Sequence, residues 1–106
     1  MDVYQGGRHL YTWKVSTGKR GHSTPTGLFR PIRLSKYYHS KTYHNAPMPY
    51  SVFFAKGYAL HGTKSITSLG KRASHGCVRL RPSHAKLFYK IVKNAGLGNT
   101  RIQIIN

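Results

Sequence analysis

The sequence predicts a mostly-β single domain with one helix near its C-terminus. A length of 106 residues is enough for one domain with a modest core. Short runs of aromatic and β-branched residues, separated by turn residues, recur along most of the chain, whereas only residues 83–95 show a helical period. No linker or repeat interrupts residues 1–106, so we expect one domain. A longer precursor that is trimmed at its N-terminus would leave this same domain.

The first third of the chain predicts two strands joined by a turn-rich segment. Residues 10–15, "LYTWKV", combine strand-forming residues with a loose alternation. Residues 18–27, "GKRGHSTPTG", are rich in turn formers. Residues 28–34, "LFRPIRL", return to a strand pattern, in which Pro31 lacks an N–H and therefore favours an edge or a bulge.

Residues 35–49, "SKYYHSKTYHNAPMP", show no clear period. An irregular segment of this length inside a compact domain is usually functional. Its three tyrosines and two histidines leave two interpretations open. One is an adaptable surface loop packed by its own aromatic side chains, and the other is a lid over a site.

The second half of the chain predicts further short strands. Residues 50–54, "YSVFF", and 58–62, "YALHG", favour two strands around a Lys-Gly turn. Residues 74–80, "SHGCVRL", indicate a turn that enters a strand at Cys77, and residues 100–105, "TRIQII", predict a closing strand.

A helix is expected after Pro82. Ser83 can cap its first turn, and Leu87 and Ile91 fall one turn apart. Gly96 can end the helix, because glycine readily adopts the backbone conformation of a C-terminal cap.

The charge balance is extreme, with 18 Lys and Arg against one acid and a formal charge of +17. Such a surface favours an anionic partner: nucleic acid most commonly, or else anionic wall polymers or lipid surfaces. The apolar stretches are too short to span a membrane. Residues 1–7 are short and polar and do not resemble a cleavable signal.

The single acid, Asp2, restricts the possible chemistry. It excludes a two-carboxylate glycosidase and a carboxylate-rich Mg²⁺ or Ca²⁺ site. A Ser-His-Asp triad would have to recruit Asp2 from beside a chain end. The lone Cys77 excludes an internal disulfide and the common zinc sites. A His-dominated metal site from His61, His75 and Cys77 remains open, but no carboxylate would orient its ligands, so we favour a nucleophile over a metal ligand. We expect no metal and no other cofactor.

Cys77 is a candidate nucleophile. A thiol needs a base or a positive field to attack at neutral pH. His61 ends one predicted strand and Cys77 begins another, so the two side chains can meet. Gly76 permits a tight backbone whose amides could point at a developing oxyanion. Three basic residues nearby add a potential that favours the thiolate: Lys71, Arg72 and Arg79.

Each of these residues also has a structural interpretation. A lone cysteine is usually a small buried hydrophobe, although the polar neighbours of Cys77 argue against that here. His61 could be a hydrogen-bonded structural histidine, and His75 could simply brace the turn.

Several blocks of the sequence resemble the L,D-transpeptidase (YkuD) catalytic domain. "HG" at residues 61–62 followed by "SHGCVRL" is similar to the family signature. Other blocks fall in family order, and the likeness covers residues 11–105: "VSTG" (15–18), "TPTGLF" (24–29), "MPY" (48–50), "YALHGT" (58–63) and Gly70. The strand that usually precedes residues 10–15 is shortened here, and residues 35–47 match no family motif.

The resemblance implies a β-sandwich of mixed sheets with the cysteine in a cleft between them. It implies an enzyme that cross-links bacterial peptidoglycan. Cys77 would attack the carbonyl of the diamino acid at position three of a tetrapeptide stem, release the terminal D-alanine and form a thioester. An amine of a neighbouring stem would resolve the thioester. An L,D-carboxypeptidase or hydrolase with water as acceptor is the alternative, and a basic nucleic-acid-binding module would leave the ordered Cys and His blocks unexplained.

The resemblance also implies roles for individual residues. His61 would take the thiol proton, while the carbonyl of Gly62 holds its other ring nitrogen. Ser74 and His75 would brace the turn, and the amides near Gly76 and Cys77 would form the oxyanion hole. Tyr50 and Arg79 would bind substrate, with ordering of the strand as the other role of Arg79.

The expected partners follow from the same resemblance. They are peptidoglycan stem peptides and the anionic cell-wall surface, whereas nucleic acid is not expected. The expected location is the bacterial cell envelope, and the expected state is a monomer. Carbapenem-type β-lactams are expected to acylate Cys77.

Overall fold

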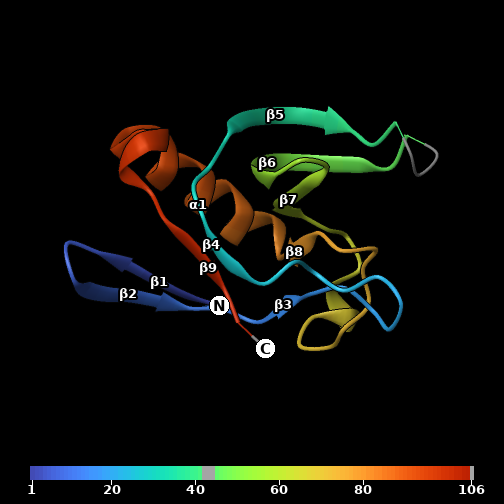
Figure 1. Cartoon of the computed structure of the whole chain (residues 1–106). Coiled ribbons are helices and arrows are strands. Elements are labelled where there is room, and N and C mark those ends of the chain that lie inside the picture. Colours follow the sequence, from blue (N-terminus) through green and yellow to red (C-terminus); the bar gives the residue numbers. More distant parts are fainter. Residues whose placement is uncertain (42–44, 106) are drawn as a thin grey trace.

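The computed structural model describes residues 1–41 and 45–105 and places one α-helix against a central mixed sheet (Figure 1). The elements in chain order are β1 (Asp2–Gln5), β2 (Arg8–Thr12), β3 (Val15–Ser16), β4 (Gly27–Phe29), β5 (Arg33–His39), β6 (Pro47–Ala55), β7 (Tyr58–Gly62), the 3₁₀ turn η1 (Ile66–Ser68), β8 (Val78–Leu80), α1 (Pro82–Ala95), the 3₁₀ turn η2 (Leu97–Asn99) and β9 (Ile102–Ile104). The predicted fold class, mostly strands with a single helix near the C-terminus, is confirmed.

The central sheet has five strands in the order β3-β8-β7-β6-β5, and β1-β2 and β4-β9 form two small antiparallel sheets. All pairs in the central sheet are antiparallel except β7 and β8, which run parallel. In that pair Leu60 lies opposite Val78 and His61 lies opposite Arg79. The carboxyl ends of the two strands therefore lie side by side.

The two faces of the central sheet have different roles. Leu60, Val78 and Leu80 belong to the same buried cluster as Phe88 and Val92 of α1. Side chains alternate between the faces along a strand. The residues between these positions, including His61 and Arg79, consequently face away from the helix. Packing of α1 on one face thus leaves the opposite face available for a site.

Helix α1 begins one residue earlier than predicted. Pro82 occupies its first turn, where its fixed φ is favourable and its missing N–H costs nothing. Arg81 is the N-cap residue and makes no side-chain cap, so the prediction that Ser83 caps the helix is wrong. Gly96 ends the helix as expected, with φ of 93° and its N–H bonded to the carbonyl of Val92.

The amino-terminal strand, which was expected to be shortened, is present as β1. β1 and β2 form a hairpin, and Met1 and Trp13 exchange two backbone hydrogen bonds of 2.8 Å each at its open end. Asp2 lies within this hairpin, where it accepts a hydrogen bond of 2.6 Å from Thr12 Oγ1. The predicted strand at residues 10–15 is divided between β2 and β3.

The predicted strand at residues 28–34 is also divided. Its first part, in β4, pairs with β9, whereas its last part, in β5, pairs with β6. Pro31 stands between the two strands, so its missing N–H interrupts the ladder as the sequence indicated.

The prediction that residues 35–49 are irregular is wrong for most of that segment. Strand β5 extends to His39 and β6 begins at Pro47, so the segment is largely a hairpin, and residues 42–44 lie outside the described residues. The hairpin was hidden because β5 is an edge strand, whose side chains are exposed or half-buried on both faces.

The remaining predicted strands are confirmed. Residues 50–54 lie in β6, residues 58–62 form β7, and the closing strand is β9. The strand after the turn at residues 74–77 starts at Val78, one residue later than expected. Among the described residues, no helix is long and apolar enough to cross a membrane.

Candidate active site

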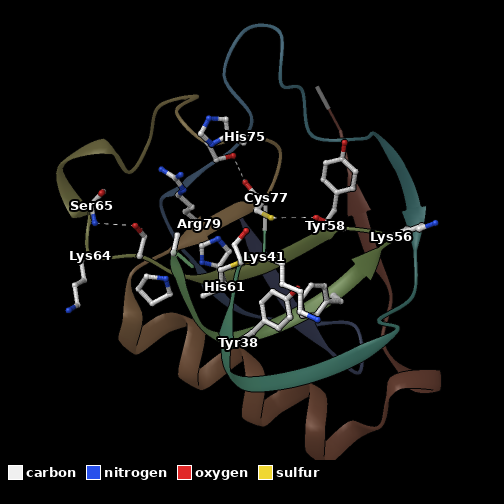
Figure 2. A pocket seen from close by; sticks show the side chains of 18 residues that line it. Tyr38, Lys41, Lys56, Tyr58, His61, Lys64, Ser65, His75, Cys77 and Arg79 are labelled. Atoms are coloured by element: carbon white, nitrogen blue, oxygen red, sulfur yellow. Dashed lines mark hydrogen bonds between the residues drawn. The ribbon is translucent and has the colours of Figure 1, made fainter. Parts of the chain in front are cut away.

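A cavity of about 540 Å³ lies on the face of the central sheet that α1 leaves uncovered, and both His61 and Cys77 line it (Figure 2). The lining residues come from β5 to β8 and their connecting loops: Tyr38, Ser40, Lys41, Ala46, Pro47, Met48, Phe53, Lys56, Gly57, Tyr58, His61, Thr63, Lys64, Ser65, Ser74, His75, Cys77 and Arg79. The expectation of a cleft between two sheets is therefore corrected, because one sheet with its loops supplies this lining.

The parallel pairing of β7 and β8 brings His61 and Cys77 together. Because Leu60 lies opposite Val78, the preceding residue, Cys77, lies beside Ala59. His61 is two residues further along β7, so it is a diagonal neighbour of Cys77 on the same face. Both side chains are directed at the cavity in Figure 2. The sequence prediction that two strand ends place these residues in one site agrees with this arrangement.

His61 is held in one orientation by its own neighbour. Its Nδ1 lies 2.7 Å from the carbonyl oxygen of Gly62. A carbonyl only accepts, so Nδ1 carries the proton and Nε2 is left with a lone pair. His61 is 7% exposed. This burial lowers the pKa of His61 to about 4. The hydrogen bond to Gly62 opposes the shift, whereas the positive charge of Arg79 adds to it.

The thiol of Cys77 is half-buried, and this burial raises its pKa. A hydrogen bond from the Ala59 backbone and the charge of Arg79 act in the opposite direction without reversing the shift. The expectation that nearby basic residues favour the thiolate therefore holds for Arg79, but burial outweighs it. At neutral pH the site holds a neutral thiol beside a neutral imidazole.

The turn that carries Cys77 is braced from within by Ser74. The hydroxyl of Ser74, which is 1% exposed, donates a hydrogen bond of 2.5 Å to the carbonyl of Cys77. The same oxygen accepts a bond of 3.1 Å from the N–H of Gly76. The amide of Gly76 is thus committed to Ser74. Of the two amides predicted to form an oxyanion hole, the one at Cys77 remains as the candidate donor.

Gly76 cannot be replaced without displacing its surroundings. Its φ is 122°, which side chains rarely adopt, and a Cβ at this position would lie 2.5 Å from Cε1 of Tyr58. Tyr58 also lines the cavity, so the glycine allows an aromatic wall to approach the turn closely.

His75 and Arg79 also line the cavity, whereas Tyr50 does not. The exposed ring of His75 meets His22 edge-on, with ring centres 4.9 Å apart. Tyr50 packs with the core on the helix side of the sheet, and its ring centre is 5.5 Å from that of Tyr89. The structure therefore does not bring Tyr50 into the site, and its expected role in substrate binding is withdrawn.

Sequence reasoning missed the wall of the cavity opposite the turn. Tyr38, Met48 and Phe53 pack with Ala59 and Cys77 into a small apolar cluster beside the thiol. Tyr38 and Met48 belong to the segment that was interpreted as irregular. A strand pattern in β5 would have revealed Tyr38, but the edge position of β5 removes the alternation of polar and apolar residues.

Three lysines at the cavity were not singled out either: Lys41, Lys56 and Lys64. Together with Arg79 they surround the opening with positive charge. The only acidic side chain of the protein, Asp2, lies in the β1–β2 hairpin and does not line the cavity. In residues 1–41 and 45–105, no group of three or more His, Cys, Asp or Glu could hold a metal ion.

Comparison with known proteins gives consistent matches. The model of the YkuD L,D-transpeptidase catalytic domain matches residues 1–104. A probable L,D-transpeptidase, ErfK/SrfK of Escherichia coli, is 31% identical over all of this chain and 36% of its own length. An L,D-transpeptidase from Stackebrandtia nassauensis has a similar structure, with a TM-score of 0.85, 27% identity, and 99% of this chain and 49% of that one covered.

A third match shares the fold at lower identity. It is the LD transpeptidase LdtMt1 in complex with imipenem, with a TM-score of 0.87, 24% identity, and 98% of this chain and 53% of that one covered. The chain thus spans about half the length of the two solved structures and 36% of the length of the curated relative.

Proposed function

The chain belongs to the YkuD L,D-transpeptidase catalytic-domain family, and from this we propose that it is a cysteine-dependent acyltransferase acting on peptidoglycan stem peptides. The observation that carries the proposal is the arrangement at the cavity. The only cysteine of the chain shares one cavity with a buried histidine whose Nδ1 is held by the Gly62 carbonyl. That arrangement provides a nucleophile and a correctly protonated base without any carboxylate.

The first half-reaction transfers the acyl group to the enzyme. Sγ of Cys77 attacks the carbonyl carbon of the diamino acid at position three of the donor stem, while Nε2 of His61 takes the thiol proton. The carbonyl oxygen becomes an oxyanion, which the N–H of Cys77 stabilises. The tetrahedral intermediate then collapses, the bond to the terminal D-alanine breaks, and His61 returns the proton to the leaving amine.

The second half-reaction regenerates the thiol. An amine of a neighbouring stem attacks the thioester, loses a proton to His61 and forms the new amide bond. His61 then returns that proton to the departing sulfur. Water in place of the amine would give an L,D-carboxypeptidase or a hydrolase, and the same residues would serve both outcomes.

The charge of the cavity supports an anionic donor. Arg79 lies opposite His61, three lysines line the same opening, and no acidic side chain lines it. Stem peptides carry carboxylates, so Arg79 serves to bind substrate as well as to lower the pKa of His61 and of Cys77.

The overall charge of +17 supports docking to the anionic wall surface in the cell envelope. Nucleic acid is the competing partner, but it would make no use of the thiol and the imidazole in the cavity.

Mass spectrometry of the products tests the proposal. The wild-type protein and Cys77→Ala are incubated with tetrapeptide-bearing muropeptides. Cross-linked dimers from the wild type alone support the transpeptidase, and trimmed tripeptides support the alternative with water as acceptor. Unchanged muropeptides with a folded wild-type protein would refute both.

A further inference from the structure

We propose that Thr24 is a positioning residue for acyl transfer, because its hydroxyl fixes the peptide group between Gly76 and Cys77 and thereby the direction of the Cys77 N–H. This inference rests on the proposed function of Cys77 as the nucleophile. Thr24 lies in the "TPTG" block, 52 residues before Gly76, and does not line the catalytic cavity.

The hydrogen bonds of Thr24 have a defined polarity. The buried hydroxyl donates to the carbonyl of Gly76 at 2.7 Å and accepts from the N–H of Gly18 at 2.9 Å. An N–H can only donate, so the hydroxyl has its single proton free for Gly76. The side chain is 9% exposed, which leaves water little access to replace it.

The bond to Gly76 controls more than one atom. In a trans peptide group the C=O of one residue and the N–H of the next are rigidly coplanar and point in opposite directions. Fixing the oxygen of Gly76 therefore fixes the N–H of Cys77. Glycine imposes little restriction of its own on the backbone, so this peptide group needs an anchor from elsewhere in the chain.

The rest of the turn has anchors besides the hydroxyl of Thr24. The N–H groups of Ala73 and Ser74 donate to the carbonyl of Thr17 at 2.9 and 3.0 Å, and the carbonyl of Ser74 accepts from Lys19 at 2.8 Å. Ser74 itself holds the N–H of Gly76 and the carbonyl of Cys77. Loss of the Thr24 hydroxyl also frees the N–H of Gly18, but that peptide group keeps the two bonds to its Thr17 carbonyl. The loss should therefore release mainly the peptide group between Gly76 and Cys77 and leave the turn in place.

Two reactions of the thiol separate this role from a general structural one. Acylation by p-nitrophenyl acetate forms the Sγ–C bond while the carbonyl oxygen becomes an oxyanion, and p-nitrophenolate then leaves. Alkylation by iodoacetamide forms an Sγ–C bond as iodide leaves, with no oxyanion at any stage. A misdirected Cys77 N–H should slow only the first reaction.

The experiment measures both rates on the whole protein by mass spectrometry of the adducts. Thr24→Val replaces the hydroxyl with a methyl group of similar size and should lower the acylation rate about 10- to 100-fold while alkylation changes by no more than about twofold. Thr24→Ser should restore acylation. Thr100→Val is the matched control, because Thr100 Oγ1 also donates to a glycine carbonyl, that of Gly96 at 3.0 Å, away from the site.

Two results would overturn the proposal. Acylation that is unchanged in a folded Thr24→Val protein would mean that the peptide group is held without the hydroxyl. An equal loss in both reactions would mean that Thr24 shapes the thiol itself. If Thr24→Val does not fold by circular dichroism, Thr24→Ala takes its place and is judged by the same ratio of rates.

The proposed function is tested separately with the wild-type protein and stem peptides. Failure of that turnover, together with a selective loss of acylation in Thr24→Val, would refute the substrate and leave the role of Thr24 standing.

Discussion

The Nδ1 of His61 lies 2.7 Å from the carbonyl oxygen of Gly62, the next residue in the chain. Catalytic histidines are often oriented by a carboxylate, which also stabilises the charged ring. A backbone carbonyl orients the ring with much less charge stabilisation. That difference fits a protein with one acid: burial lowers the pKa of His61 to about 4, and the bond to the Gly62 carbonyl opposes this shift without reversing it.

Replacement of Cys77 by alanine should abolish acyl transfer and leave the fold intact. The chain has no other thiol, and loss of the nucleophile should remove at least about a thousandfold of the rate. Turnover of stem peptides and thermal unfolding are measured together. Activity that survives in a folded Cys77→Ala protein would refute the covalent mechanism.

Replacement of His61 by glutamine should slow acylation and move its optimum to higher pH. Without Nε2 as a base the thiol must ionise by itself, and burial raises the pKa of that thiol. The acid limb of kcat/KM in the wild type should lie near pH 4, where His61 becomes protonated. His75→Gln is the comparison, and its effect should be smaller because His75 is exposed. An equal collapse in both folded variants would make the assignment of the base wrong.

The same histidine should make the stability of the fold depend on pH. Its pKa is about 4 when folded and about 6.5 when unfolded, so the unfolded chain binds the extra proton between these values. Stability is therefore complete above about pH 6.5 and decreases by up to about 3 kcal/mol as pH falls to about 4. Urea unfolding across this range measures the effect. His61→Gln should have a flatter profile, and an identical slope in both proteins would contradict the prediction.

The sequence predicted the elements that are apolar runs between turn residues or that repeat with a helical period. Strands β6 and β7 are largely buried runs on both sides of a Lys-Gly turn, and α1 has a clear helical period. Strand β5 was missed because an edge strand buries neither face fully. Strand β1 was missed because Val3 is its only buried residue and one residue makes no pattern.

The sequence predicted only those site residues that lie within short sequence motifs. Cys77 and His61 were found from the residues around them, and the parallel pairing of their strands brings them together. Tyr50 was assigned from a family block, yet its side chain packs with the core on the helix side of the sheet. The hydrogen bond between Thr24 and Gly76 spans 52 residues and leaves no periodic signal in the sequence.

Carbapenem-type β-lactams should acylate Cys77 and no other residue. The strained ring presents a carbonyl to the thiol as a donor stem does, and opening of the ring leaves the acyl group attached to sulfur. Mass spectrometry of the intact protein and of the peptide that contains Cys77 should show a single adduct. Cys77→Ala serves as the control. A folded protein whose thiol reacts with iodoacetamide but never with a carbapenem would favour another class of substrate.

Binding to isolated wall material should weaken steeply as salt rises, whereas turnover of a short stem peptide should weaken less. The Debye length falls from ~10 Å at 0.1 M to ~3 Å at 1 M, so salt screens long-range attraction between the +17 chain and anionic polymers most strongly. The contact of a donor carboxylate with Arg79 in the cavity is screened less, because part of the water is excluded there. Sedimentation with sacculi and peptide turnover are measured over one salt series.

Two double variants separate the charge around the cavity from the charge elsewhere. Lys56→Gln with Lys64→Gln removes two charges beside the site, and Lys90→Gln with Lys93→Gln removes two from the exposed side of α1. Wall binding depends on total charge and should fall similarly in both proteins. Turnover of the short peptide should fall only in the first, because only those lysines act on a bound stem. Wall binding that does not change with salt would show that charge does not attach the protein to the wall. Tighter binding to nucleic acid than to sacculi at equal salt would favour a nucleic-acid partner.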